Sequence, residues 1–351
     1  MSNILDNDFK YIENSSLPFE KYRNKCFLIT GATGLIGSLL IKSLLYCNDH
    51  QNLNVRIIAV VRDMYKATSI YQAYINKSSL KFVICDLKYD KITVQGDIDY
   101  IIHCAAMTTS KDMISNPVEC LQIAENGTNT VLELAKQKKV ASVVYLSSME
   151  VYGQLNVKNH LIDEKELGNI DLSSIRSCYP EGKRFCECLC HAYAHQYGIN
   201  VIIARLAQTF GAGILKNEGR VFAQFAKSIL ENKDLVLKTE GLSEGNYVYS
   251  ADAVIGILLL LTEGKSGEAY NIVNEECHTT IKHMAELVIE NFGNQKQKIV
   301  YDIPDKKSIS EYAPDVKMHL SSKKINCLGW HANIGLLEAY DRMIKYMQEE
   351  F

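Results

Sequence analysis

The sequence lacks any hydrophobic run of the length that a membrane span requires. A transmembrane helix needs about 18 or more predominantly apolar residues, and the stretch VIGILLLL at 254–261 predicts only a buried helix. The N-terminal segment MSNILDNDFKYIENSS is polar and acidic and has no apolar core of the kind found in secretory signals. We therefore expect a cytoplasmic protein that has no membrane partner.

An excess of charge of either sign is also missing. The chain of 351 residues has 38 Lys and Arg against 41 Asp and Glu, which gives a formal net charge of −3. Proteins that bind nucleic acid usually carry a basic patch or a strongly basic domain. The charge balance therefore predicts that nucleic acid is not a partner.

The cysteine and histidine spacings do not predict a metal site. The 11 cysteines occur without a secretory signal, so we expect reduced thiols and not a disulfide framework. Cys186, Cys188 and Cys190 are spaced by two residues, and such positions on a helix point to different faces. His191 and His195 have a spacing that can bind zinc, but a third ligand is missing from the pattern. We predict no bound metal.

Short apolar runs alternate with helical patterns over the first two thirds of the chain. Continuous apolar strands separated by helices are typical of a parallel sheet that is covered on both faces, and right-handed crossovers make such a sheet doubly wound. The prediction is an α/β fold with a Rossmann-type parallel sheet. The expected strands lie at 25–30, 55–61, 80–87, 97–106, 142–148 and 200–206, and two expected helices at 124–140 and 179–197.

This alternation weakens after residue 206, which suggests three parts. We expect an N-terminal extension at 1–24 and a dinucleotide-binding Rossmann domain at 25–206. The remainder, 207–351, is expected to form mainly a smaller substrate-binding lobe, with some segments returning to the Rossmann sheet. Ligands of such sheets bind at the carboxyl ends of the strands, so the lobe should cover that edge.

A glycine-rich segment, GATGLIG, follows the first predicted strand. Gly31, Gly34 and Gly37 would allow a tight turn and bring backbone N–H groups to a pyrophosphate at the start of a helix. The same turn predicts contacts to the cofactor from Thr33, Leu35 and Ile36.

The end of the second predicted strand usually selects the dinucleotide. An acidic residue there binds the ribose hydroxyls of NAD, whereas an arginine accommodates the 2′-phosphate of NADP. This chain has Arg62 followed by Asp63, so NAD and NADP both stay open. Asp86 follows the third strand, where its carboxylate could reach the adenine amine or could cap the strand end.

One tyrosine and one lysine are four residues apart in SSIRSCYPEGKRFCECLC, at Tyr179 and Lys183. Such spacing is common on ordinary helices, but here paired serines end the preceding strand at Ser148. In that setting Lys183 would lower the pKa of Tyr179 and hold the nicotinamide ribose. Tyr179 would then remove a hydroxyl proton while Ser148 steadies the oxygen.

These motifs together resemble the extended short-chain dehydrogenase/reductases that act on nucleotide sugars, the NAD-dependent epimerase/dehydratase family. The resemblance extends over about residues 25–340, and RSCYPEGKR and GRVFAQF look most like UDP-glucuronate decarboxylases. Further matching segments are HCAA at 103–106, NGT at 126–128, ARLAQTFGAG at 204–213 and YVYSADAV at 247–254.

The resemblance implies a reaction and a site. Bound NAD would oxidise C4 of the sugar to a transient ketone, which is then decarboxylated or epimerised; a 4-epimerase or a 4,6-dehydratase are alternatives. An alternative that is not an enzyme is a regulatory protein that binds a dinucleotide without catalysing a reaction. The resemblance adds Leu87, Ala105 and Ala106 to the cofactor site, and a substrate site at Ser148, Met149, Glu150, Gln208 and Arg220.

Two positions depart from the family pattern. After the serine, dehydratases of the family carry Asp-Glu and decarboxylases Ser-Glu, whereas this chain has Met149-Glu150. Glu150 is expected to act as a base at C5 of the sugar or to hydrogen-bond it, and Met149 disfavours dehydration because it cannot protonate a leaving hydroxyl. The arginine that commonly contacts the diphosphate is Gly245 here, so we expect Arg220 to compensate.

The family also implies a homodimer, formed by the helices at about 124–138 and 180–197. The apolar face of the second helix includes Phe185, Leu189 and Tyr193. This face is equally compatible with packing into the core of one chain.

Overall fold

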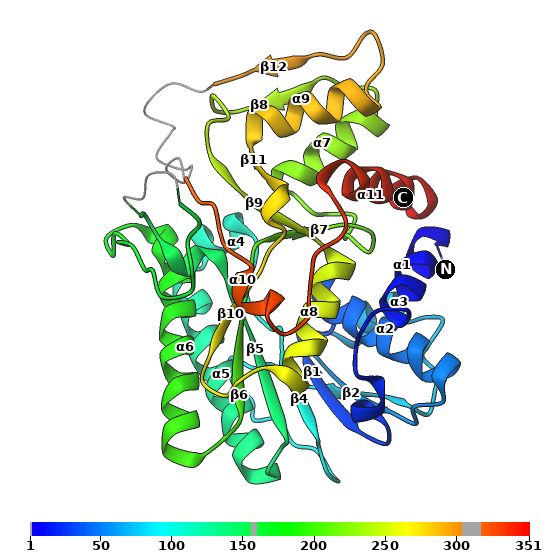
Figure 1. Ribbon diagram of the computed structural model, residues 1–351, viewed down its shortest axis with the longest axis vertical. Helices are drawn as coiled ribbons and strands as arrows, with labels where there is room; N and C mark the ends of the chain where they lie inside the picture. The colour runs from blue at the N-terminus through cyan, green and yellow to red at the C-terminus, as the bar shows by residue number, and fades with distance from the viewer. Residues whose placement is uncertain (1, 156–159, 304–316) are drawn as a thin grey trace.

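A seven-stranded, entirely parallel sheet forms the centre of the protein (Figure 1). The computed structural model describes residues 2–155, 160–303 and 317–351. The strand order β10-β6-β5-β4-β1-β2-β3 is that of a doubly wound sheet, so the predicted fold class is confirmed. The strands are β1 Cys26–Thr30, β2 Arg56–Val61, β3 Leu80–Ile84, β4 Tyr100–His103, β5 Ser142–Ser148, β6 Val201–Leu206 and β10 Ala269–Ile272.

Two of these strands are shorter than the sequence predicts. β3 ends at Ile84 because the chain then turns, with the Asp86 carboxylate accepting a hydrogen bond from the Lys88 N–H at 3.0 Å. β4 ends at His103, and the N–H of Ala105 donates to a side-chain oxygen on β1 and not to a neighbouring strand. The carboxyl ends of β3 and β4 lie at the same edge of the sheet, where loops follow and the hydrogen bonds between strands stop.

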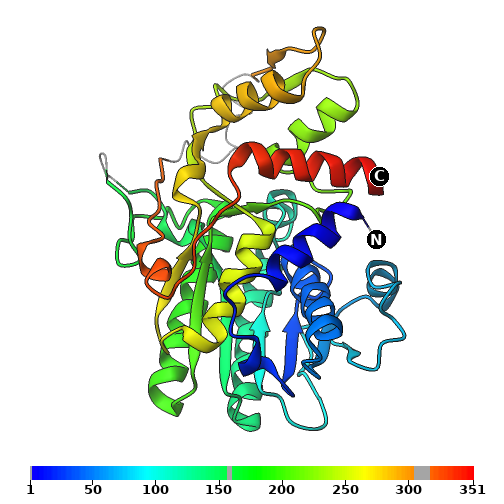
Figure 2. The ribbon, with the colours of Figure 1, turned by 45° about the vertical axis from the view of Figure 1, so that its right-hand side comes forward.

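Helices cover both faces of the sheet, with a separate hydrophobic core on each side. One face carries α5 and α6, and the other carries α2 and α8, as Figures 1 and 2 show from two directions. The apolar run at 254–261 lies in α8 and is buried, as predicted. No helix in the described ranges is long and apolar enough to cross a membrane. The helices on the two faces are α2 Leu35–Gln51, α5 Pro117–Lys138, α6 Cys178–Tyr197 and α8 Ser250–Glu263, and two shorter helices, α3 Met64–Ile70 and α4 Ser110–Ser115, follow β2 and β4 in the chain.

A smaller lobe lies over the carboxyl end of the sheet, at the top of Figure 1. It contains a three-stranded sheet, β11-β9-β7, and a parallel pair, β12-β8. Its strands are β7 Gln208–Phe210, β8 Leu235–Leu237, β9 Glu244–Tyr249, β11 His278–Thr280 and β12 Ile299–Tyr301. Its helices are α7 Val221–Leu230, α9 Ile281–Phe292 and α11 Leu336–Glu350, whereas α10 Lys323–Asn326 packs against β10 of the main sheet. Short 3-10 turns occur at η1 Phe19–Tyr22, η2 Met149–Tyr152, η3 Ile175–Ser177 and η4 Glu275–Cys277.

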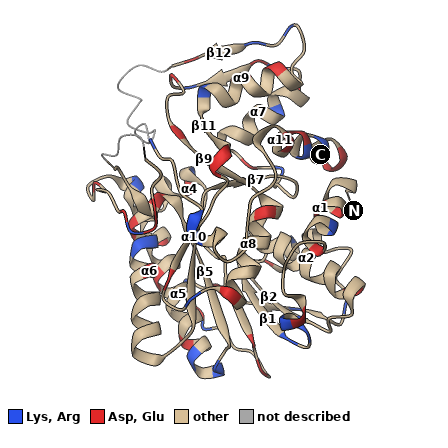
Figure 3. Cartoon of the chain, in the orientation of Figure 1, with Lys and Arg blue, Asp and Glu red and all other residues tan. Residues whose placement is uncertain are grey.

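In its described residues the structure shows neither a patch of charge of one sign (Figure 3) nor a disulfide among its cysteines. Basic and acidic residues are interspersed over both lobes (Figure 3). All 11 cysteines are free thiols. Within the described ranges no three His, Cys, Asp or Glu side chains converge as a metal site would require.

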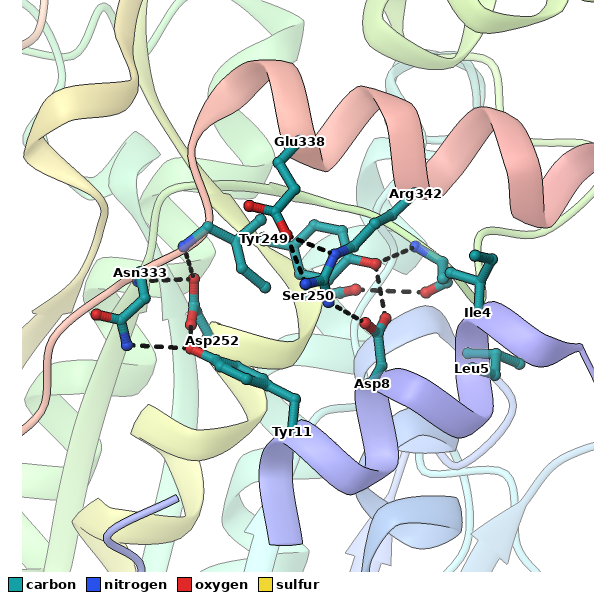
Figure 4. A network of polar contacts seen from close by, with 12 residues as sticks. Ile4, Leu5, Asp8, Tyr11, Tyr249, Ser250, Asp252, Asn333, Glu338 and Arg342 are labelled. Atoms are coloured by element: carbon teal, nitrogen blue, oxygen red, sulfur yellow. Dashed lines mark hydrogen bonds and ion pairs between the residues drawn. The ribbon is translucent and has the colours of Figure 1, made fainter. Parts of the chain in front are cut away.

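The first helix, α1 Asn3–Glu13, ties the beginning of the chain to its end (Figure 4). It packs against α2, α8 and α11. The Asp8 carboxylate is buried and accepts hydrogen bonds from Arg342 at 2.7 Å and from Tyr249 at 2.6 Å. Tyr11 donates to Asp252 at 2.6 Å. Arg342 of α11 therefore neutralises the negative charge of Asp8, which α1 buries beneath the lobe.

Burial raises the pKa of Asp8 from 3.8 to about 6, although Tyr249 and Arg342 oppose the shift. The folded protein therefore holds this proton up to a higher pH than the unfolded chain. The contribution to the free energy of unfolding is present at low pH and is lost as pH rises through about 6.

We predict that the stability of the wild type relative to Asp8→Asn falls by about 1 kcal/mol between pH 5 and pH 7. Urea unfolding of both proteins at the two pH values measures this difference. Asp6→Asn, which removes a carboxylate paired with Lys10 on the same helix, is the control for the loss of one carboxylate from α1. A pH-independent difference for Asp8→Asn contradicts the assignment.

Candidate active site

The glycine-rich loop joins β1 to the start of α2, and its three glycines differ in how closely other atoms approach them. Gly31 has φ +62°, and a Cβ there would lie 2.7 Å from the Ala105 nitrogen. A Cβ on Gly37 would lie 2.4 Å from the Gly31 carbonyl oxygen. These two glycines therefore allow the loop to fold. Gly34 is different, because a Cβ there would meet only the Gly31 oxygen, at 3.4 Å.

The open side of Gly34 lies at the amino end of α2, a helix of 17 residues. The first backbone N–H groups of a helix have no acceptor inside it and carry partial positive charge. Here they belong to the residues around Leu35 and Ile36, with Thr33 in the turn before them. The geometry fits the pyrophosphate of a dinucleotide that lies against Gly34.

The residues predicted to bind the adenosine half of the cofactor lie at the ends of two neighbouring strands, β2 and β3. Arg62 is exposed directly after β2. The Asp63 carboxylate caps α3 by accepting from the Lys66 N–H at 3.1 Å, much as Asp86 caps the turn after β3. Each carboxylate thus has a structural role and one further oxygen. Leu87 is buried at the same edge of the sheet.

The end of β4 links the cofactor loop to the predicted catalytic pair. Ala105 donates its N–H to the Thr30 hydroxyl at 3.2 Å, which holds it beside the glycine loop. Ala106, the next residue, borders a small cavity that reaches Tyr179 and Lys183. The residues lining this cavity are Ala106, Met107, Cys120, Ala124, Tyr179 and Lys183.

Tyr179 and Lys183 lie on the first turns of α6, beside the end of β5. The Lys183 ammonium group is buried and donates to the Leu146 carbonyl at 2.6 Å. It lies 4.8 Å from the ring centre of Tyr145 and 5.8 Å from that of Tyr179. Burial lowers the pKa of Lys183. One N–H of the Lys183 ammonium group therefore donates to β5, and the other two are available to donate to a ribose hydroxyl.

The pKa of Tyr179 is raised and not lowered. Burial is the main cause, and the negative charge of Glu150 adds to it. A hydrogen bond with Ser148 and the charges of Arg176 and Arg220 act in the opposite direction. The sequence suggested that Lys183 would lower this pKa, but burial outweighs the nearby cations. Burial therefore favours the protonated form of Tyr179, and the interaction with Ser148 opposes this effect.

Glu150 is not a free carboxylate. It pairs with Arg176, whose Nη2 lies 2.9 Å from Oε1 of Glu150, and both side chains are partly buried. The Glu150 N–H donates to the Ser148 hydroxyl at 3.2 Å. The turn η2 therefore holds Glu150 near Tyr179, with a counterion that the sequence analysis did not identify.

The two departures from the family pattern touch one another. Met149 is buried, and its terminal methyl lies 3.4 Å from the position that a Cβ on Gly245 would occupy. Met149 comes from the turn after β5, and Gly245 comes from β9 of the upper lobe. The pair makes an apolar contact between the sheet and the lobe.

The predicted substrate residues Gln208 and Arg220 lie in the upper lobe. Gln208 begins β7, directly after β6, and is partly exposed. Arg220 precedes α7, and its guanidinium pairs with Glu218 at 2.7 Å and lies 4.8 Å from the ring centre of Phe222. Its charge opposes the rise in the pKa of Tyr179, which links it electrostatically to that residue.

Comparison with known proteins agrees with this geometry. The model of the NAD dependent epimerase/dehydratase family matches residues 27–273. The chain belongs to this family. It is 30% identical over 335 residues to UDP-glucuronic acid decarboxylase 6 of Arabidopsis thaliana, covering 93% of the chain and 89% of that protein. It is 26% identical over 334 residues to dTDP-D-glucose 4,6-dehydratase of Bos taurus, covering 93% and 90%.

Solved structures support the same fold. A UDP-glucuronic acid 4-epimerase from Bacillus cereus, in complex with UDP-glucuronic acid and NAD, superposes with a TM-score of 0.75 at 22% identity. That comparison covers 93% of this chain and 100% of the other. The predicted family membership is thus confirmed, and the chain is an enzyme of the NAD-dependent epimerase/dehydratase family.

A buried ion pair fixes helix α6, which carries Tyr179 and Lys183, against the sheet. Arg205 of β6 binds Glu187 of α6 through two hydrogen bonds, at 2.6 and 3.0 Å. The Ser147 hydroxyl of β5 donates to the same carboxylate. Glu187 follows Lys183 by one helical turn, so the ion pair between Glu187 and Arg205 also fixes how far Lys183 lies from β5.

Four residues at the site were not identified from the sequence: Arg176, Cys120, Met107 and Ala124. Arg176 stands three residues before Tyr179, so its proximity on the chain was the available signal. Cys120, Met107 and Ala124 line the cavity beside Tyr179 from other parts of the fold. Thiol, thioether and methyl side chains carry no spacing signal that would have placed them there.

We predict that Gly34→Val abolishes dinucleotide binding, weakening it more than about 100-fold, because the valine methyl groups fill the space for the pyrophosphate. The backbone at Gly34, with φ −85° and ψ 172°, tolerates valine, so the variant should remain folded. Titration with NAD and NADP measures the effect.

Gly335→Val is the matched control, since Gly335 also precedes a helix, with φ −73° and ψ 169°. A Cβ there would meet no atom within 4 Å. If a folded Gly34→Val protein bound NAD as the control does, the loop would not be the cofactor site.

Proposed function

We propose that this enzyme oxidises C4 of a nucleotide sugar to a transient ketone and then decarboxylates or epimerises the ketone. The observation that carries the proposal is the position of Tyr179, one helical turn from Lys183 and near enough to Ser148 for that hydroxyl to lower its pKa. All three lie at the carboxyl edge of the sheet, next to the glycine-rich loop. A protein that only bound a dinucleotide would not need this proton-transfer group.

The residues have separate roles in the first step. NAD, when bound, supplies the hydride acceptor. Tyr179 acts as the base in its phenolate form, after its own proton has been released to solvent; it then takes the proton from the C4 hydroxyl, and Ser148 holds the oxygen as it becomes a carbonyl. Lys183 and the guanidinium of Arg176 lower the energetic cost of negative charge on the tyrosine oxygen. The buried setting of Tyr179 makes these charges effective, because the local dielectric is low.

The second step depends on the turn η2. Glu150 is the carboxylate nearest in sequence to Ser148 and is held at the tyrosine, which favours chemistry at C5. Met149 has no proton to give to a leaving hydroxyl, which argues against 4,6-dehydration. The similarity to UDP-glucuronic acid decarboxylases over nearly the whole chain supports decarboxylation, and the B. cereus neighbour is a 4-epimerase.

We also propose that the cofactor is NAD and that the substrate is a nucleoside-diphosphate sugar. Neighbouring structures were solved with NAD bound, and Arg62 keeps NADP as the alternative. Gln208 and Arg220 are the proposed substrate contacts in the upper lobe. Arg220 offers a positive charge that suits a diphosphate.

Incubation of the purified protein with UDP-, dTDP-, CDP- and GDP-sugars, supplied with NAD or NADP, tests the proposal. Mass spectrometry separates loss of carbon dioxide, loss of water and isomerisation. Loss of carbon dioxide or a change of configuration supports the proposal. Loss of water identifies a dehydratase, and absence of any reaction favours a binding protein.

For catalysis, we predict that Tyr179→Phe lowers turnover by about 10²- to 10⁴-fold and leaves NAD affinity nearly unchanged. Only the proton-transferring oxygen is removed, and the ring stays in place. Steady-state kinetics and NAD titration measure the two quantities. Tyr197→Phe, near the end of the same helix and exposed, should behave as the wild type. Normal turnover in Tyr179→Phe would place the proton transfer elsewhere.

For the second step, we predict that Glu150→Gln still permits C4 oxidation, seen as NADH absorbance, and that a keto-sugar accumulates. The amide keeps the shape of the side chain but cannot accept a proton. Glu181→Gln, on α6, serves as the control. Formation of final product at the normal rate would remove Glu150 from the mechanism. Ketone that has already lost carbon dioxide would place Glu150 in the return of hydride.

We propose a homodimer through α5 and α6. Of the helix face considered in the sequence analysis, Phe185 is exposed, whereas Tyr193 is buried and hydrogen-bonds to Glu133. Val118 and Leu121 of α5 are also exposed. We expect a dimer in analytical ultracentrifugation, converted to monomer by Phe185→Glu but not by Leu337→Glu on α11. A monomeric wild type would exclude this interface.

A further inference from the structure

The guanidinium of Arg176 lies over the ring of the catalytic tyrosine. Its central carbon is 5.5 Å from the ring centre of Tyr179. One terminal nitrogen, Nη2, pairs with Glu150 at 2.9 Å. The short turn η3, directly before α6, sets this position. Arg176 is therefore fixed at the reacting centre by an aromatic ring and a carboxylate.

The other terminal nitrogen of Arg176 lacks a partner. Nη1 is buried and has no hydrogen-bond acceptor in the described part of the chain. Buried polar groups in native proteins are nearly always paired, and an unpaired charged donor is costly. Glu150 already neutralises the charge, so the missing partner is an acceptor oxygen. A donor kept in this state beside a catalytic hydroxyl is suited to an oxygen that arrives with the substrate.

The surrounding side chains do not compete for that oxygen. Arg220 is paired with Glu218, and Lys183 donates to the Leu146 carbonyl from within the cofactor side of the site. The floor formed by Met149 and Gly245 is apolar. A polar group on the sugar near the reacting carbon would therefore find its donor at Arg176.

We propose that Arg176 is the residue that recognises the C5 substituent of the sugar, through a hydrogen bond from Nη1 to an oxygen on C6. The inference rests on the proposed function, because it assumes a nucleotide sugar whose C4 lies at Tyr179. A carboxylate and a hydroxymethyl group both supply such an oxygen. Glu150 holds the guanidinium in place, so recognition and the second step use one ion pair.

The test uses the nucleoside diphosphate, among UDP, dTDP, CDP and GDP, whose glucose derivative the unsubstituted protein binds most tightly. Its glucuronate, glucose and xylose derivatives are compared, because xylose has no C6. Dissociation constants are measured with NAD present in a Tyr179→Phe background, which prevents turnover and keeps the ring under Arg176.

Arg176→Gln is expected to weaken the glucuronate or glucose derivative about 10- to 100-fold. The xylose derivative and the free nucleoside diphosphate should change by less than about threefold. A larger loss for glucuronate than for glucose identifies a carboxylate as the natural partner, and the reverse identifies a hydroxyl. Arg176→Lys, which restores the charge but not the second nitrogen, should recover only part of the loss.

Arg56→Gln, an exposed arginine at the start of β2, is the control. Equal losses for all three sugars and the free diphosphate would assign Arg176 a structural role and overturn the inference. Unchanged affinities would overturn it as well. Failure of the unsubstituted protein to bind any nucleotide sugar would instead refute the proposed function, and this inference with it.

Discussion

The buried pair between Glu187 and Arg205 is the interaction on which the site depends. Its two partners belong to the catalytic helix and to the neighbouring strand β6, and their side chains are only 7% and 5% exposed. Ions in such surroundings are costly unless they are fully hydrogen-bonded, and Ser147 and Tyr152 complete the set. The helix α6 can therefore dock in only one rotation and at one depth. The positions of Tyr179 and Lys183 are fixed with it, because both residues belong to α6.

The chemistry of the site follows from opposing effects on one phenol. Burial and Glu150 raise the pKa of Tyr179, whereas Ser148, Arg176 and Arg220 act against them. The result is a neutral acid at rest, surrounded by cations that become useful when negative charge develops. Arg176 belongs to this balance and also to the ion pair with Glu150, so the charges on Tyr179 and Glu150 are electrostatically linked.

Much of this arrangement was predictable because it is local in sequence. The strand-loop-helix pattern around Gly31, Gly34 and Gly37 specifies a phosphate-binding turn by backbone geometry alone. Tyr179 and Lys183 are one helical turn apart wherever the helix lies. The first six strands of the main sheet were identified from their apolar runs, with errors only at the ends of β3 and β4. There a side chain or a neighbouring loop replaced the ladder hydrogen bonds.

The sequence by itself determined the fold class and the family, and it located the glycine-rich turn and the Tyr179–Lys183 pair on their elements, because each depends on residues within a few turns of one another. Only the tertiary structure brought Met149 to Gly245, Asp8 to Arg342 and β10 back beside β6. It also gave Glu150 its partner Arg176 and reversed the expected shift of the Tyr179 pKa. These features depend on burial and on contacts between distant segments. No local pattern encodes them, because the energy of each contact exists only after the sheet has assembled.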